Sequence, residues 1–440
     1  MLGRWLFITM GSVWFLASSA VGGELTFTKD VAPILYNHCT SCHRPNEVGP
    51  FNLITYADAK RRGRQLVEVT TRRVMPPWKP VKGHGQFLYD RSLSEEQIAI
   101  IQKWYEAGMP EGDAKDLPPL PKFTDGWHLG PPGLILKVEK PFRIPAEGDD
   151  LYVHFVLPTG LTKDQPFRAV QVLPSNKRVA HHAVPMLDVH KGKAYELARK
   201  DGYYIRFDPG FLPRGFLPGY APGMMTHELP EDQPGVLPQG MDVVLQMHYH
   251  PTGKEEWDQP QIGIYFADKP PKRNPSVILL ANNEIDIPPG ERHYKRTDQF
   301  QLPVDYEIRS IFAHMHMIGK QVRVWAELPD KTKRSLLYID DWDYRWQDTY
   351  VYAKPLVLPR GTIIKAEFIW DNSENHPRNP YSPPRRIRWG ERSTDEMSGI
   401  IIGGMTVKPN DEGWHWLAVL GHYFDIERKA NAAKSKWKDN

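Results

Sequence analysis

The chain has 440 residues, 40% of them hydrophobic, which is enough for buried cores and excludes an intrinsically disordered protein. Its 56 lysines and arginines nearly balance 53 aspartates and glutamates, and a net charge of +3 without a long basic run argues against nucleic acid as a partner. Two cysteines in the whole chain exclude a disulfide framework.

The N-terminus has the layout of a secretory leader. After Arg4, residues 5–16 are apolar and residues 17–20 are small. This order predicts a signal peptide over residues 1–20 with cleavage near Ala20, and therefore an exported, periplasmic protein. The apolar run is shorter than the roughly 20 residues of a spanning helix, but an uncleaved membrane anchor stays open as the alternative.

Residues 24–116 have a helical pattern. We expect helices over Ala32–Cys39, Thr55–Thr70 and Ser94–Ala107. The third helix is the best marked, because Ser94 with Gln97 forms a capping box before an apolar stripe and a glycine with a proline follows.

The segment Cys39-Thr40-Ser41-Cys42-His43 lies between the first two expected helices. Two thiols at this spacing, followed at once by a histidine, are typical of c-type haem attachment, with one thioether to each cysteine and the imidazole as an axial ligand. A thioredoxin-like pair or a structural zinc site is the alternative, but there is no second cysteine pair and no βαβ pattern. The sequence therefore predicts one covalent haem c.

The second axial ligand is expected downstream. Met75 is the preferred candidate, because the Pro76-Pro77 pair after it can hold its thioether in place and a Met/His pair raises the haem potential. Met109 is the alternative ligand, and packing of Met75 in the core is the third reading. This part of the chain resembles a small class I cytochrome c domain.

A Pro-rich linker at residues 117–126 ends the helical pattern, and the apolar period then changes to two. The pattern predicts antiparallel β-sandwiches, divided near residues 269–274 into domains at 127–272 and 273–424 and followed by a basic tail at 425–440. The expected strands are Leu151–Val156, Phe167–Leu173, Val243–His248, Ile262–Phe266, Tyr306–His314, Gln321–Leu328, Ile363–Trp370 and Gly399–Ile402.

Histidines gather in this β portion. His314 and His316 alternate on one strand, so both imidazoles can face the same ion. His181 and His182 are adjacent and would diverge on a regular strand, so they can share an ion only at a strand end or bulge. His248 can complete that set from a neighbouring strand, although His250, two residues later, could replace it.

Met397 offers a thioether to the His314 and His316 pair, with Met405 as its alternative. Two imidazoles and a thioether suit copper cycling between two oxidation states better than zinc, calcium or magnesium. Asp395 and Glu396, just before Met397, either orient ligands or lie in a solvated turn. No role is assigned to the three histidines in loop-like settings, which are His190, His227 and His376.

Four motifs occur in the order and approximate spacing of the copper type II, ascorbate-dependent monooxygenases, the family of dopamine beta-monooxygenase and the peptide-amidating monooxygenase. They are His181-His182-Ala183-Val184, Gln246-Met247-His248-Tyr249, His314-Met315-His316 and Thr394-Asp395-Glu396-Met397. The chain resembles this family over residues 127–423. The resemblance implies two β-sandwich, jelly-roll-like domains that each hold one copper. It implies an electron-transfer copper on His181, His182 and His248, and a catalytic, oxygen-binding copper on His314, His316 and Met397.

Two positions depart from the family. The peptide-amidating branch has an Arg two residues before its His-x-His pair and a Tyr four residues after its Met, which grip a substrate carboxylate. Phe312 and Ile401 occupy those positions here. A peptide with a C-terminal glycine is therefore a poor substrate, and a more apolar pocket is expected.

These observations predict an O2-dependent monooxygenase that hydroxylates a small organic substrate. The fused haem would supply the electrons, and another cytochrome or an ascorbate-like reductant would reduce the haem. The competing prediction is a non-catalytic electron carrier or copper-binding protein. A zinc hydrolase is weaker, because Met is a poor zinc ligand and no Glu-bearing His motif is present.

Overall fold

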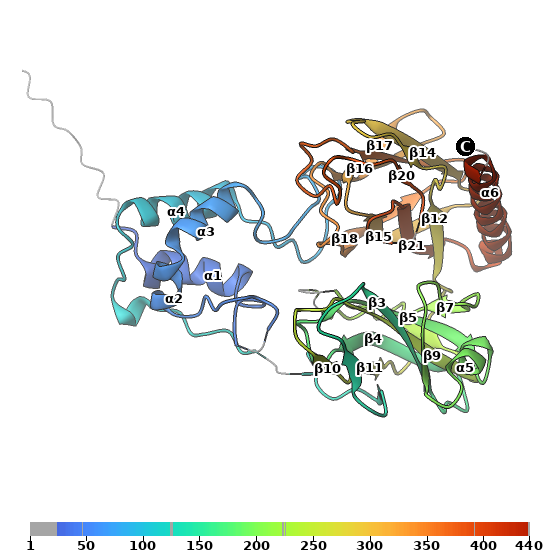
Figure 1. The fold of residues 1–440 in the computed structure, drawn as a ribbon, viewed down its shortest axis with the longest axis horizontal. Coiled ribbons are helices and arrows are strands. Elements are labelled where there is room, and N and C mark those ends of the chain that lie inside the picture. Colours follow the sequence, from blue (N-terminus) through green and yellow to red (C-terminus); the bar gives the residue numbers. More distant parts are fainter. Residues whose placement is uncertain are drawn as a thin grey trace, which may run out of the picture.

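The computed structural model describes residues 24–438, apart from 46, 124–125, 222–223, 225 and 391. It has three parts: a helical segment (24–123), a first β unit (126–266) and a second β unit (276–438), as Figure 1 shows. Antiparallel sheets make up most of it. The expected signal peptide lies outside the described residues. Within them, no helix combines the length and the apolar character needed to cross a membrane.

The helical segment begins with a π-helical turn, Phe27–Val31, and a short 3-10 turn at Ala114–Asp116 follows its last helix. Its helices are α1 (Ala32–His38), α2 (Tyr56–Arg61), α3 (Gly63–Thr71) and α4 (Glu95–Glu106). The capping box of Ser94 and Gln97 at the start of α4 is confirmed. The buried faces of the helices form one core around Trp104 and Leu35.

The prediction of one continuous helix over Thr55–Thr70 was wrong. Arg62 leaves the helical conformation, with φ −110° and ψ 7°, and α2 ends there. Gly63 then begins α3. Its Cα lies close to Met109, and a Cβ at this position would be 2.3 Å from Met109 Sδ. The break therefore lets the chain turn at the one residue small enough for this contact.

The first β unit contains two antiparallel sheets on a common core. One sheet has the order β1-β11-β4-β8 and the other β6-β3-β9-β5-β7, and a small β10-β2 pair closes one end. Helix α5 (Lys193–Ala198) follows β5. The strands are β1 (Leu134–Lys137), β2 (Phe142–Ile144), β3 (Leu151–Pro158), β4 (Gln165–Leu173), β5 (Ala180–Val189), β6 (Tyr203–Ile205), β7 (Gly215–Phe216), β8 (Gly235–Leu237), β9 (Met241–Tyr249), β10 (Glu256–Asp258) and β11 (Gln261–Phe266).

The second β unit repeats this plan with sheets β12-β21-β15-β18 and β14-β19-β16-β17 on a second core, and with a β13-β20 pair. A 3-10 turn, Pro409–Asp411, leads into α6 (Glu412–Lys438), which runs along β12 and includes most of the expected basic tail (Figure 1). The strands are β12 (Ser276–Leu280), β13 (Asp286–Ile287), β14 (Tyr294–Gln301), β15 (Tyr306–Met315), β16 (Gly319–Glu327), β17 (Lys333–Ile339), β18 (Thr349–Leu358), β19 (Ile363–Trp370), β20 (Ile387–Arg388) and β21 (Ser398–Thr406).

All eight strands expected from the alternating pattern are present, with ends shifted by a few residues. The pattern missed others, including β5, β14 and β18. β14 exposes charged and polar residues along Tyr294–Gln301, and β18 contains a proline, so neither has a clear apolar alternation. The consequence matters most for β5, because that strand carries His181 and His182.

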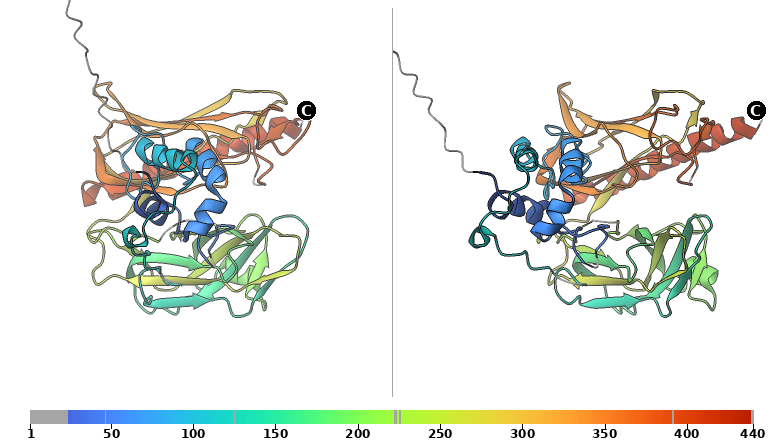
Figure 2. Two further views of the ribbon diagram at one scale, coloured as in Figure 1. Left: turned by 90° about the vertical axis from the view of Figure 1, so that its left-hand side faces the viewer. Right: turned by 60° about the vertical axis from the view of Figure 1, so that its left-hand side comes forward.

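The helical segment lies across the boundary between the two β units (Figure 2). Residues 78–88 leave the helices and pack on the second β unit, where Trp78 and Phe87 contact its core. The Glu47 carboxylate accepts from Lys177 of the first β unit at 2.8 Å. Arg91 pairs with Asp348 of the second β unit, also at 2.8 Å. The helical segment is thus joined to both.

Candidate metal and haem centres

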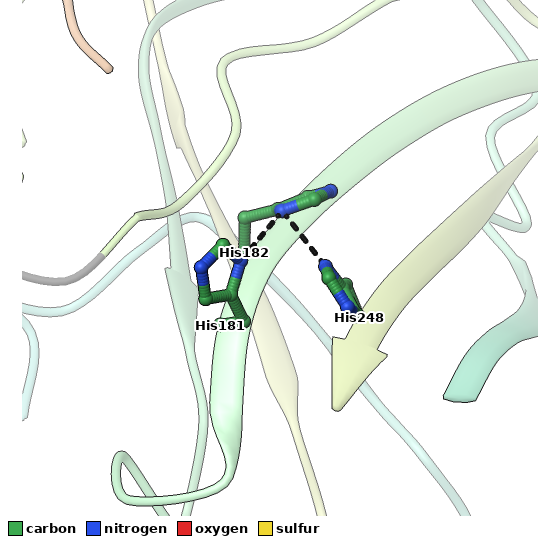
Figure 3. Close-up of side chains that lie close together, drawn as sticks. All are labelled: His181, His182 and His248. Atoms are coloured by element: carbon green, nitrogen blue, oxygen red, sulfur yellow. Dashed lines mark hydrogen bonds between the residues drawn. The ribbon is translucent and has the colours of Figure 1, made fainter. Parts of the chain in front are cut away.

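Three histidine side chains converge at the start of β5. The pairing with β9 shifts between Ala180 and His182, and this irregularity turns the side chains of two adjacent residues toward one point. His182 Nδ1 lies 3.2 Å from His181 Nδ1 and 3.2 Å from His248 Nδ1 (Figure 3). The structure therefore brings together three of the expected ligands by the bulge that adjacent histidines require.

Two of the three imidazoles, those of His181 and His182, are held neutral. Burial, and then the proximity of His248, lowers the pKa of His181 to about 4, and the same two causes hold the pKa of His182 well below its usual range. Their ligand atoms all lie within 4.8 Å of one another. Neutral ring nitrogens that face each other at this distance provide three lone pairs for one cation, so the cluster fits a metal ion.

Asp150 and Tyr152 contact His248. Tyr152 lies in β3, and Asp150 is the residue just before this strand. His248 Nε2 donates to Asp150 Oδ2 at 2.8 Å, which leaves Nδ1 free for an ion. Burial raises the pKa of Asp150, but hydrogen bonds from His248 and His250 outweigh it and hold the pKa at about 2. Tyr152 stacks on His248 at 4.2 Å. The His250 side chain is exposed, and its Nδ1 donates to Asp150 Oδ1 at 2.7 Å, outside the three-histidine cluster.

Sequence reasoning did not single out Asp150. Its carboxylate follows Asp149 in a turn before β3, and nothing in the local pattern separates it from a solvated acid. Its partner His248 is 98 positions away. Only the pairing of β3 with β9, which places Tyr152 opposite His248, brings the two together.

The second cluster lies at the end of β15, with His314 in the strand and His316 just after it. The rings of His314 and His316 lie 5.0 Å apart and nearly perpendicular. His314 Nδ1 donates to Gln347 Oε1 at 2.7 Å, and His316 Nδ1 donates to the Asp395 carbonyl at 3.2 Å. With both Nδ1 atoms engaged, each Nε2 is the free ligand atom. Burial and then His314 lower the pKa of His316 to about 3, and burial lowers that of His314.

The strand register places Met397 beside this pair. β15 and β21 pair His314 with Gly399 and Met315 with Ser398, so His316 faces Met397 one step beyond the ladder. Residues two apart share a face of a sheet, and Met397 therefore lies on the face of His314 and His316. Met405, the alternative thioether, is buried opposite Glu307 at the other end of β21.

Glu396 is fully buried between these ligands, which excludes the solvated turn. Its carboxylate accepts from the backbone N–H groups of His316, Ile318 and Met397 at 3.0, 2.8 and 3.3 Å, and from the Trp370 indole at 2.8 Å. Burial raises its pKa to about 8, against the effect of these donors. Glu396 thus fixes the end of β15 to the start of β21.

Tyr344 of the second β unit reaches the first cluster. The ring of Tyr344, from the second unit, lies 6.2 Å from the ring of His181 in a stacked orientation. The pKa of His182 is also lowered, as minor causes, by His314 and His316. The two histidine clusters are therefore near enough for charge at one to act on the other.

The candidate haem residues lie at the end of α1. Cys39 and Cys42 are unpaired thiols, and burial raises the pKa of Cys39 to about 12. His43 Nδ1 donates to the Phe51 carbonyl at 3.1 Å, which leaves Nε2 free. Two separate thiols beside an imidazole with one free ring nitrogen fit a haem held by two thioethers and one axial bond.

The two methionine candidates have different surroundings. Met109 packs in the helical core, with its sulfur against Gly63 and Tyr105. Met75 lines a cavity of about 430 Å³ beside Leu93 and Ile98. Met75 therefore borders open space, whereas the sulfur of Met109 fills a packing position.

A larger cavity of about 680 Å³ lies next to Cys42, between the helical segment and both β units. Tyr220 on its wall pairs through its backbone with Ala183, the residue after His182. Through Tyr220, the cavity that borders Cys42 also adjoins β5, the strand that carries His181 and His182. Of the histidines without an assigned role, His227 lines this cavity and stacks on Tyr89, His190 binds Asp242, and His376 is buried.

No family model matches this chain, and no curated protein matches it. Among solved structures, PNGF-II is similar over 61% of this chain and 65% of its own, with 11% identity and a TM-score of 0.29, in its P21 crystal form. An infectious bursal disease virus structure, of the Gx strain, matches 62% of this chain and 73% of that chain, with 10% identity and a TM-score of 0.19. This chain thus spans just under two thirds of PNGF-II. Likenesses at this level do not identify a shared family or function.

Proposed function

We propose that this protein is a haem- and copper-containing monooxygenase that uses O2 to hydroxylate a C–H bond of a small organic substrate. The observation that carries the proposal is the pair of histidine clusters on two adjoining β units. One cluster presents three Nδ1 atoms, and the other presents two Nε2 atoms with a methionine at the adjacent register position. Because their ligand sets differ, the two sites suit different tasks. The three-histidine site would store an electron, and the site with the methionine would bind O2.

The chain's residues hold and orient this machinery. Copper ions at the two sites would supply one-electron chemistry and the activation of O2. Asp150 keeps the proton of His248 on Nε2, and the Asp395 carbonyl keeps that of His316 on Nδ1, so the ligand atoms point inward. Glu396 fixes the relative position of His316 and Met397.

An apolar substrate group is proposed from the side chains next to the second cluster. Phe312 and Ile401 pair across β15 and β21, on the same face as His314 and two positions from it. Phe312 stacks beside His314 at 6.4 Å, and Ile401 is 41% exposed. Gly399, opposite His314, adds no side chain to this row. The row provides apolar surface and no cation for a carboxylate.

The helical segment is proposed as the built-in electron donor, with haem bound through Cys39, Cys42 and His43 and with Met75 as second axial ligand. Its ion pairs with both β units support this role, because they hold the haem-binding turn at a fixed position. Each turnover of a monooxygenase needs two electrons, which a one-electron haem delivers singly. We also propose that another cytochrome or an ascorbate-like reductant reduces the haem, and that the protein is exported to the periplasm.

Metal analysis with the haem spectrum tests the composition, and two coppers and one haem per chain are expected. Met397→Leu should abolish product formation and O2 uptake in the presence of reductant and a panel of small apolar compounds, while the haem spectrum is unchanged. Met405→Leu is the matched control, because that thioether is buried away from the histidines. Unchanged turnover in Met397→Leu would refute the assignment.

The alternative is a non-catalytic electron-transfer or copper-binding protein. Mixing reduced haem with the Cu(II) form in a stopped-flow instrument separates the two. Haem oxidation with no hydroxylated product from any compound favours the carrier. If the haem stays reduced while substrate is turned over, the haem is not the electron donor.

A further inference from the structure

The loop of residues 340–348, which joins β17 to β18, contacts both histidine clusters, and we call it the bridging loop. Tyr344 stacks near His181 of the first cluster, with 6.2 Å between ring centroids. Gln347 Oε1 accepts from His314 Nδ1 of the second cluster at 2.7 Å. The other end of the same amide, Gln347 Nε2, donates to the Tyr344 carbonyl at 2.7 Å.

The bridging loop is fixed at several points. Trp342 is buried, and its indole donates to the His316 carbonyl at 3.1 Å. Asp343 accepts from the backbone N–H and the guanidinium of Arg345. Arg91 of the helical segment pairs with Asp348 at 2.8 Å. A loop anchored on both sides of Tyr344 and Gln347 presents these side chains in one arrangement.

We propose that Tyr344 and Gln347 are positioning residues that set the geometry of both metal sites from one loop. The inference rests on the proposed function, because it takes the two histidine clusters to be copper sites. Gln347 fixes the proton of His314 on Nδ1, so that Nε2 faces the ion. Tyr344 covers the ring of His181 from across the boundary between the units.

The amide of Gln347 makes the two effects dependent on each other. Its acceptor end serves His314, and its donor end holds the backbone that carries Tyr344. A glutamate at this position would keep an acceptor for His314 but would lose the donor. A leucine would lose both. The two substitutions therefore separate the local effect on the second site from the effect transmitted to the first.

Copper affinity by chelator competition and the EPR spectrum of the Cu(II) form test the inference on the full-length holoprotein. Gln347→Leu should weaken copper binding at the His314, His316 and Met397 site by about 10–100-fold, the usual effect of removing a partner of a ligand. It should also change the EPR signal of the three-histidine site. Gln347→Glu should restore the affinity of the second site but not the signal of the first. Tyr344→Ala should alter the first site alone.

Arg345→Lys is the matched control, because this half-exposed side chain lies on the same loop and pairs with Asp343. It should leave both sites unchanged. If the wild-type protein binds no copper, the proposed function fails. If it binds two coppers but Gln347→Leu leaves both affinities within twofold and both signals unchanged, the bridging role is overturned while the proposed function stands. Circular dichroism of each variant identifies any that fails to fold, and Gln347→Glu then carries the test.

Discussion

Replacement of Glu396 by alanine probes the strongest structural link at the second cluster. The carboxylate accepts from the backbone N–H groups of His316 and Ile318 and from the Trp370 indole at 2.8–3.0 Å, and from Met397 at 3.3 Å. Each buried donor left without a partner costs about 1–3 kcal/mol. We expect a loss of about 3–5 kcal/mol, in the lower part of the sum for the three donors at 3.0 Å or less, because water can enter the space and satisfy some of them.

Urea denaturation of the full chain, followed by tryptophan fluorescence, measures this loss, since Trp342 and Trp370 are buried in the same core. Asp395→Ala is the matched control, because that carboxylate accepts from the Arg392 backbone N–H at 3.3 Å at an exposed position. It should change stability by no more than about 0.5 kcal/mol. A loss below about 1 kcal/mol in Glu396→Ala would show that these hydrogen bonds do not hold the strand ends together.

Three further predictions concern other parts of the chain. Asp150→Ala should weaken copper binding at the three-histidine site by about 10–100-fold in chelator competition, whereas His250→Ala should have little effect there. Burial lowers the pKa of His415 to about 4, so the unfolded chain binds one more proton between pH 4 and 6.5 and stability falls as the pH falls through this window. In urea titrations at about pH 7 and pH 5, His415→Phe should reduce that fall by up to about 1.4 kcal/mol per pH unit; an unchanged slope contradicts the assignment. Replacing both Cys39 and Cys42 by serine should remove haem-stained protein from a denaturing gel, and retained stain would show that the haem is not held through these thiols.

Local sequence patterns predicted much of the secondary structure. The capping box at Ser94, the alternating strands and the strand position of His314 depend on neighbours within a few residues, and all are present in the structure, whereas His316 follows the end of β15. The break at Arg62 was missed, because it depends on a contact between Gly63 and Met109, 46 positions away. A helix pattern alone does not contain that contact.

The sequence by itself predicted candidate residues for metal and haem binding, because ligand type and spacing are properties of short segments. It also indicated that His181 and His182 need a bulge to share an ion, which follows from the alternation of side chains along a strand. Tertiary structure decided that His248, and not His250, completes this cluster, since the register of β9 with β5 places His248 opposite His182 and β9 ends at Tyr249. It also decided the partners Asp150, Glu396 and Gln347. Each of these acts on a histidine at least 33 positions away, and only strand pairing and loop packing bring such groups within hydrogen-bonding distance.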